Sequence, residues 1–295
     1  MSQQIPTPEE LAEKFRKLEE KAESLKQQLY SQKDSAELEA KLQKVADKTS
    51  LLAYNEEMLL AQFEHNLNAF EEYFPDVYQV IKDYQPSRYF VELVDGFPNI
   101  YDEEKEQYIY KYPAYLMSLL QLEKYQQEPQ STHSAFEMNK RNSGNFIHSE
   151  YLNKIIQTLS ERVETERTAK KGLPETIGSL VLFGAGCGYQ IELLINQHQI
   201  YNLYLIEPEL DLFFASLYST NWRYILESLD KKECNLHLSI GIQDGDFFDD
   251  LLYQTYQNGR YDVVKTFGYV HYHSPLIDKL LGIYKSRFYE MIQGW

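Results

Sequence analysis

The sequence SLVLFGAGCGYQ, at residues 179–190, decides the fold of this chain. Residues 180–183 form a continuous apolar run of β-favouring types that stops at a glycine, which predicts a short buried strand. Three alternate glycines then allow a tight turn with close backbone approach, and apolar residues from Ile191 begin a helix. Strand, glycine turn and helix in this order predict the opening of a nucleotide-binding βαβ unit, in which free amides at the helix start favour an anionic or polar ligand.

A regular alternation of apolar strands and helices follows the glycine turn. The predicted strands lie at residues 202–206, 235–240 and 261–265, and the predicted helices at residues 209–218, 247–256 and 276–292. An amphipathic helix at residues 146–163 leads into the sheet. Alternation at this spacing implies a parallel sheet with right-handed crossovers. We therefore predict an α/β fold class, with a Rossmann-like parallel sheet flanked by helices over residues 136–295.

The first 53 residues predict a helical, coiled-coil-like arm. Two capping boxes, at residues 7–10 and 34–37, open two helices whose apolar residues recur at the coiled-coil spacing of about 3.5. The short break between the helices indicates an antiparallel hairpin or an arm that self-associates. The same apolar seam is also expected of helices that pack on the rest of the protein, and the sequence leaves these alternatives open.

Residues 54–135 predict a helical segment followed by a small antiparallel β unit. The predicted helices lie at residues 54–74, 77–84 and 113–125, and the predicted strands at residues 88–94, 99–101 and 108–112. The strands alternate apolar and polar residues around an acidic turn, which favours an antiparallel arrangement. Residues 126–134 are polar and predict a linker into the α/β domain.

The chain of 295 residues carries a formal net charge of −16. This charge argues against nucleic acid or an anionic membrane as a partner, because both need a basic face. Two cysteines are too few for a disulfide framework or a four-cysteine zinc site, and Cys187, between two glycines, is interpreted as a small buried residue. Polar and acidic residues follow Met1 and no apolar run approaches about 20 residues, so neither a secretory signal nor a membrane span is predicted. We expect a cytoplasmic protein.

A tentative nucleotide pocket is predicted around the glycine turn. Glu207 lies at the carboxyl end of the second strand, where an acid accepts hydrogen bonds from ribose hydroxyls, although an acid there is also typical of a helix N-terminus. Asp244 and Asp246 follow the third strand, where an acid can meet the base of a bound nucleoside or cap the next helix. The residues predicted to bind a cofactor are Gly184, Gly186, Gly188, Glu207 and Asp244.

Other catalytic patterns are incomplete. His271 and His273 follow the fourth strand and could bind a metal from one extended face, but no neighbouring acid or cysteine completes a ligand set. We therefore predict ordinary loop packing and no metal site. The sequence has no Walker lysine, no nucleophile elbow and no His-Glu-x-x-His motif, so phosphoryl transfer and triad hydrolysis are unsupported. The catalytic residues are unknown.

The glycine turn, Glu207 and the acids after the third strand resemble the ligand pattern of the class I methyltransferases. That resemblance implies a methyltransferase-like fold and S-adenosylmethionine as the cofactor. The family usually carries an acid two residues before the first glycine, facing the methionine part of the cofactor, and Leu182 occupies that position here. No stretch after the fourth strand resembles a catalytic signature of that family.

A second resemblance covers more of the chain, from about residue 54 to the end. The stretches VDGFPNI at residues 94–100, VLFGAGCGY at residues 181–189 and LIEPE at residues 205–209 are similar, in their order and spacing, to the N-terminal region of the Maf (motility-associated factor) flagellin glycosyltransferases. Members of that family are thought to transfer nonulosonic, sialic-acid-like sugars from a CMP-activated donor to Ser or Thr of flagellin. The resemblance implies that the transferase centre belongs to a following domain.

The Maf resemblance implies a segment without a complete catalytic centre, which requires no cofactor and serves acceptor recognition or scaffolding. The implied partners are flagellin or a flagellin–chaperone complex. The chain stops at Trp295, where the family would continue, so we expect an N-terminal fragment or a short member that lacks the transferase. An S-adenosylmethionine-dependent methyltransferase is the alternative, and a coiled-coil interaction module with a vestigial nucleotide fold is a third possibility.

Overall fold

The computed structural model describes residues 54–133, 147–169, 172–242, 246–258 and 265–291. The predicted arm over residues 1–53 lies outside these ranges, and so does Asp244. Self-association through the arm therefore stays a prediction.

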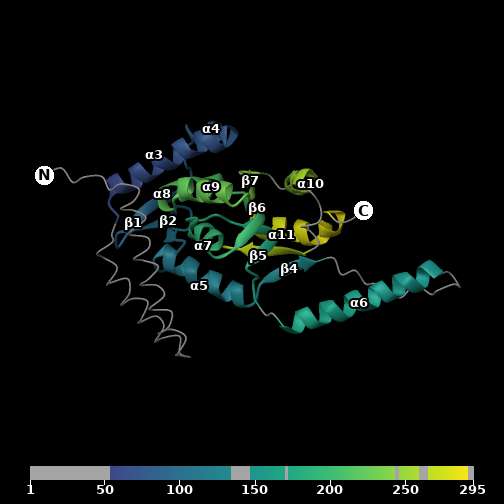
Figure 1. Ribbon diagram of the computed structural model, residues 1–295. Helices are drawn as coiled ribbons and strands as arrows, with labels where there is room; N and C mark the ends of the chain where they lie inside the picture. Colours follow the sequence, from purple (N-terminus) through teal and green to yellow (C-terminus); the bar gives the residue numbers. More distant parts are fainter. Residues whose placement is uncertain (1–53, 134–146, 170–171, 243–245, 259–264, 292–295) are drawn as a thin grey trace, which may run out of the picture.

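A five-stranded sheet with strand order β4-β8-β5-β6-β7 forms the centre of the fold (Figure 1). Its strands are β4 (Gln130–His133), β5 (Thr176–Phe183), β6 (Gln199–Glu207), β7 (Asn235–Ile240) and β8 (Lys265–Val270). Strands β8, β5, β6 and β7 pair in parallel, and β4 pairs antiparallel with β8 at one edge. The predicted α/β fold with a Rossmann-like parallel sheet is therefore confirmed.

Helices cover both faces of this sheet, because alternate side chains of each strand point to opposite sides. On one face Leu180 and Leu182 pack with residues of the helices α3 (Glu56–Tyr73), α4 (Pro75–Ile81), α5 (Ala114–Gln127), α7 (Tyr189–Gln197), α8 (Leu210–Ser219) and α9 (Trp222–Lys231). On the other face Val181 and Phe183 pack with α10 (Phe247–Asn258), α11 (Pro275–Arg287) and η3 (Phe288–Met291). The strand β5 is therefore buried on both sides, as its continuous apolar sequence predicts.

One helix stands apart from these two layers. Helix α6 (Ile147–Ala169) extends away from the sheet (Figure 1). None of the helices in the described ranges is both long enough and apolar enough to cross a bilayer.

A small antiparallel sheet of β1 (Tyr89–Val94), β2 (Phe97–Asp102) and β3 (Gln107–Tyr108) lies beside the main one, in the order β1-β2-β3. Asp95 and Gly96 form the tight turn between β1 and β2, with φ angles of 53° and 79°. Positive φ at both turn residues is what a two-residue hairpin requires, and Asp-Gly is a favoured pair for it. The antiparallel β unit is thus present as predicted, with a third strand of only two residues.

The predicted linker at residues 126–134 is wrong in one part, because Gln130–His133 forms the strand β4. The sequence QSTH shows no apolar alternation, and the strand is held by main-chain pairing with β8 instead of by side-chain burial. The segment predicted as residues 54–135 therefore contributes one strand to the main sheet.

Two further elements differ from the prediction. The fourth parallel strand is described at Lys265–Val270, which shares only Lys265 with the predicted strand at residues 261–265; residues 261–264 lie outside the described ranges. The polar Lys265 and Thr266 and the small Gly268 interrupt the apolar pattern that would have marked this strand. Helix α9 was not predicted, although its buried residues Trp222, Ile225, Leu226 and Leu229 recur at helical spacing.

Asn66 connects α3 to the loop between α8 and α9. Its side-chain amide donates hydrogen bonds to the carbonyl oxygens of Leu217 and Thr220, both at 2.7 Å. Its side-chain oxygen accepts a hydrogen bond of 2.8 Å from the N–H of Trp222, at the start of α9. Asn66 is fully buried, so water cannot replace its hydrogen bonds to these backbone groups.

We predict that Asn66→Ala lowers the free energy of unfolding by about 3 kcal/mol, because it leaves several buried backbone groups without their partner. Chemical denaturation of the two proteins measures the difference. Asn68→Ala, on the exposed side of the same helix, is the matched control and should be neutral or slightly stabilising. Equal stability of the Asn66→Ala protein and the parent would contradict the assignment.

Candidate functional site

The glycine turn follows β5 and leads directly into α7. Gly184, Gly186 and Gly188 have φ angles of 91°, 52° and 82°, in the left-handed region that favours glycine. Gly188 is also the N-cap residue of α7. The turn therefore has the backbone conformation that the sequence predicts.

The space above the three glycines is filled by side chains of the same chain. A Cβ atom at Gly184 would lie 2.6 Å from the ring of Tyr272, and one at Gly186 would lie 2.2 Å from the hydroxyl of Tyr110. A Cβ atom at Gly188 would lie 2.7 Å from the side chain of Thr220. The close approach that these glycines permit is thus used for internal packing.

Glu207 is fully buried at the carboxyl end of β6 and is hydrogen-bonded within the protein. One carboxylate oxygen accepts a bond of 2.7 Å from the N–H of Ala185. The other accepts bonds from the N–H of Glu209 at 3.0 Å and from the hydroxyl of Tyr272 at 2.6 Å. Burial raises the pKa of Glu207 to about 7, against the effect of these hydrogen bonds, which lower it. Glu207, which was predicted to accept hydrogen bonds from ribose hydroxyls, therefore accepts them from the glycine turn and from the two loops beside it.

A buried pair of polar side chains completes this arrangement. The hydroxyl of Tyr110 lies 2.7 Å from Nε2 of His271 and accepts a hydrogen bond of 3.1 Å from the N–H of Cys187. Burial lowers the pKa of His271 to about 3, so its imidazole is neutral at physiological pH. Burial also raises the pKa of the Cys187 thiol to about 12, which leaves it protonated and unreactive. The prediction of a small buried cysteine is confirmed.

The two histidines of the predicted loop point to different environments. His271 is buried beside Tyr110, whereas His273 is exposed and its Nδ1 lies at a hydrogen-bond distance of 2.7 Å from Oδ1 of Asp278. Within the described ranges, no three His, Cys, Asp or Glu side chains gather in a way that could hold a metal ion. Asp246 is exposed just before α10, and Asp244 lies outside the described ranges.

Tyr110, Thr220 and Tyr272 are site residues that the sequence did not predict. No local motif gave them a role, although Tyr272 lies between the two histidines considered above, and Tyr110 is 74 residues before the first glycine. The one signal for the two tyrosines was compositional, since the chain has 25 tyrosines. Their positions over the turn depend on how the small sheet and the segment after β8 fold back onto it.

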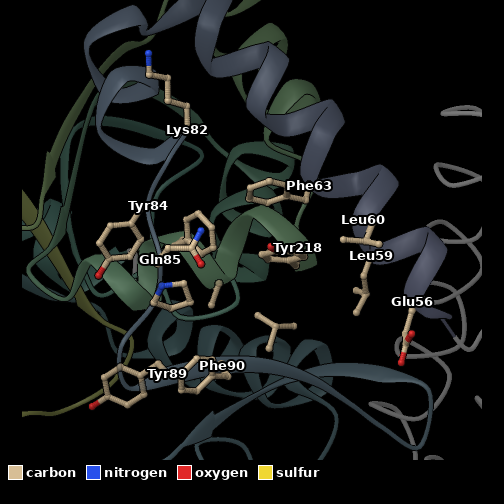
Figure 2. A pocket seen from close by; sticks show the side chains of 14 residues that line it. Glu56, Leu59, Leu60, Phe63, Lys82, Tyr84, Gln85, Tyr89, Phe90 and Tyr218 are labelled. Atoms are coloured by element: carbon tan, nitrogen blue, oxygen red, sulfur yellow. The ribbon is translucent and has the colours of Figure 1, made fainter.

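A cavity of about 630 Å³ lies elsewhere, between α3, residues 82–91 and α8 (Figure 2). Its aromatic lining consists of Phe63, Tyr84, Tyr89, Phe90, Phe214 and Tyr218. Glu56 and Lys82 lie at opposite ends of the cavity (Figure 2). The sequence gives no local signal for this cavity, because its walls come from three separate segments.

Asp211 of α8 fixes one wall of the cavity. Its carboxylate accepts hydrogen bonds from the N–H groups of Ser87, Arg88 and Tyr89, at 3.0, 2.7 and 3.1 Å. It also accepts a hydrogen bond from the hydroxyl of Tyr84. Burial acts to raise the pKa of Asp211, but these four bonds together hold it below its usual value. The segment that enters β1 is thus anchored to α8 by an ionised side chain.

Comparisons with known proteins agree with this fold. Residues 62–292 match the family model of the glycosyltransferase Maf N-terminal domain. The fold is similar to the solved structure of a Maf glycosyltransferase from Magnetospirillum magneticum AMB-1, with a TM-score of 0.56 and 17% sequence identity over 80% of this chain. The match covers 36% of the length of that protein. No curated protein matches the chain significantly.

We predict that Gly186→Ala lowers the free energy of unfolding by about 3 kcal/mol or more, because the added Cβ meets the Tyr110 hydroxyl at a positive φ. Gly282→Ala is the matched control: it lies in α11 with nothing within 4 Å of the new methyl group. That variant should gain up to about 1 kcal/mol from helix propensity. Thermal unfolding compares the two variants, and a tolerated Gly186→Ala would argue against the filled turn.

We also predict that stability contributed by Glu207 depends on pH. Its pKa is raised from 4.5 to about 7 in the folded state, so folding favours the protonated carboxyl. This contribution is complete below about pH 4.5 and is lost as the pH rises through 7, by about 3 kcal/mol in total. Denaturation between pH 4.5 and 8 should show this decline.

Glu207→Gln should remove that part of the pH dependence, because the side chain no longer titrates. Tyr272→Phe should move the decline to higher pH, since it removes a donor that stabilises the ionised form. Asn68→Ala, an exposed change on α3 that alters no titratable group, should leave the shape of the profile unchanged. A Glu207→Gln profile that is parallel to that of the parent would contradict the prediction.

Proposed function

Since the chain belongs to the family of Maf glycosyltransferase N-terminal domains, we propose that it is a non-catalytic region that recognises the acceptor or scaffolds the transferase. The acceptor in this proposal is flagellin, alone or with its chaperone, in the cytoplasm. Transfer of a nonulosonic acid to Ser or Thr is assigned to a following domain. The chain corresponds to only 36% of the length of the solved Maf protein, so the activity of the whole protein is a proposal for this chain and does not follow from the family match.

The observation that supports a non-catalytic role is the filled glycine turn. Open α/β sheets bind their ligands at the carboxyl ends of the strands, and the glycines there let a ligand approach the backbone. In this chain Tyr272, Tyr110 and Thr220 occupy that approach. A nucleotide or nucleotide-like cofactor would have to displace buried, hydrogen-bonded side chains to bind there.

The same observation disfavours the methyltransferase alternative. S-adenosylmethionine would need the oxygens of Glu207 and the space over Gly184. Tyr272 fills that space and donates to one of these oxygens, and the N–H of Ala185 donates to the other. The position where that family usually carries an acid is Leu182, which is fully buried in the apolar core. An acid there would be buried among apolar side chains without a partner. Protein recognition is therefore the better-supported role.

We predict that flagellin binds this chain in calorimetric titration, with a Kd on the order of micromolar, as is typical of transient interfaces. S-adenosylmethionine and CMP should give no binding heat under the same conditions, because their site is filled. The chain should be titrated with monomeric flagellin and with the flagellin–chaperone complex in parallel.

Micromolar binding of S-adenosylmethionine that is lost in Glu207→Ala would overturn the non-catalytic proposal. If neither form of flagellin binds, acceptor recognition is wrong, and scaffolding of the transferase remains as the narrower proposal. Glu150→Ala, which changes an exposed acid on α6, the helix that extends away from the sheet (Figure 1), controls for non-specific charge effects.

A further inference from the structure

We propose that the outer edge of β1 and the aromatic cavity beside it together bind an extended polypeptide segment by strand addition. We call this combination the β1 groove. The proposal rests on the acceptor-binding function above and names the place and the mode of binding.

The strand β1 has a free edge within the described part of the chain, because it pairs with β2 alone. In an antiparallel pair, residues alternate between directing both main-chain groups toward the partner strand and directing both away from it. The N–H of Tyr89 is bonded to Asp211 and so points away from β2. Val91 and Leu93 have the same parity and therefore present their N–H and C=O groups at the outer edge.

The aromatic cavity lies along this edge. Three consecutive residues of β1, namely Tyr89, Phe90 and Val91, all line it. Successive side chains of a strand point to opposite faces, so a cavity that contacts three in a row lies beside the strand and not over one face. The opposite wall is one face of α3, which contributes Leu59, Leu60 and Phe63 (Figure 2).

These two features select a polypeptide as the occupant. A strand edge is matched by the alternating N–H and C=O groups of an extended chain, and pockets beside it take alternate side chains. Phe63 and Tyr218, stacked with ring centroids 4.5 Å apart, offer flat apolar surface to such a side chain. Leu60 lines the cavity and is 56% exposed, so its side chain is accessible to a bound segment. The segment should therefore carry large apolar residues at alternate positions.

Charge at the two ends of the groove restricts the segment further. Glu56 lies at one end and Lys82 at the other, with the aromatic side chains between them (Figure 2). Both are exposed and can reach a bound chain. A complementary segment carries a basic residue near Glu56 and an acidic residue near Lys82. This pattern fixes the direction in which the segment runs.

The test uses the full chain and a random library of nine-residue peptides displayed on phage. Selected peptides should carry large apolar residues at alternate positions, with a basic residue toward one end and an acidic one toward the other. Synthetic copies are then measured by fluorescence anisotropy. N-methylation of alternate amides should reduce affinity at least tenfold and methylation of the intervening amides should not, because only one set faces β1.

Leu60→Glu should reduce peptide affinity at least tenfold. Val80→Glu is the matched control, since Val80 is a similarly exposed aliphatic residue on α4 that does not line the cavity. Val91→Pro should abolish binding by removing an outward N–H, whereas Val91→Ala should lower affinity only a few-fold. Proline with its nitrogen facing outward is tolerated in an edge strand, and unfolding curves confirm that the variants fold.

The inference is overturned if no peptide is selected, or if selected peptides are insensitive to Leu60→Glu, Val91→Pro and N-methylation. Flagellin binding that is unaffected by Leu60→Glu and Val91→Pro would overturn the β1 groove and leave the proposed function intact. If peptides bind the β1 groove but flagellin does not bind the chain, the proposed acceptor recognition would be overturned and the β1 groove would stand.

Discussion

The buried carboxylate of Glu207 is the interaction on which the carboxyl edge of the main sheet depends. It joins the turn after β5, the start of α8 and the segment after β8 through Ala185, Glu209 and Tyr272. One side chain can reach three connections because neighbouring parallel strands end at the same edge. Keeping a buried acid satisfied requires all three donors to stay in place. The loops at this edge therefore behave as one unit.

Folds of this type usually bind a nucleotide or a similar ligand at the glycine turn, whereas here the turn packs against side chains of the same chain. The glycine turn has the conformation of a ligand-binding loop, but its free volume is occupied by Tyr110, Tyr272 and Thr220. Glycine is still required at Gly186, because the backbone has a positive φ and the Tyr110 hydroxyl approaches closely. A glycine pattern in a sequence can thus record tight internal packing as well as a bound cofactor. The aromatic cavity along β1 and α3 lies on a different part of the molecule.

Local sequence was sufficient for the elements whose pattern is carried by their own residues. The strand β5 and its turn, the strand β7 and the Asp95-Gly96 hairpin all follow from short-range apolar periodicity or turn chemistry. The strand β4 could not be predicted, because its polar residues are held by pairing with β8. The place of Glu207 at the end of its strand could be predicted from its distance in sequence to the glycines. Its hydrogen-bond partners could not, since Tyr272 lies 65 residues further along the chain. The aromatic cavity depends on three distant segments and left no local signal.

The anchoring of residues 87–89 by Asp211 has a kinetic consequence for any chain that binds beside β1. The wall of the β1 groove is held by four hydrogen bonds before a partner arrives, so the protein loses little conformational entropy on binding. The ordering cost falls on the incoming flexible segment, which limits the lifetime of the complex. For the acceptor recognition proposed above, a short residence time would allow one acceptor to be released and the next to bind.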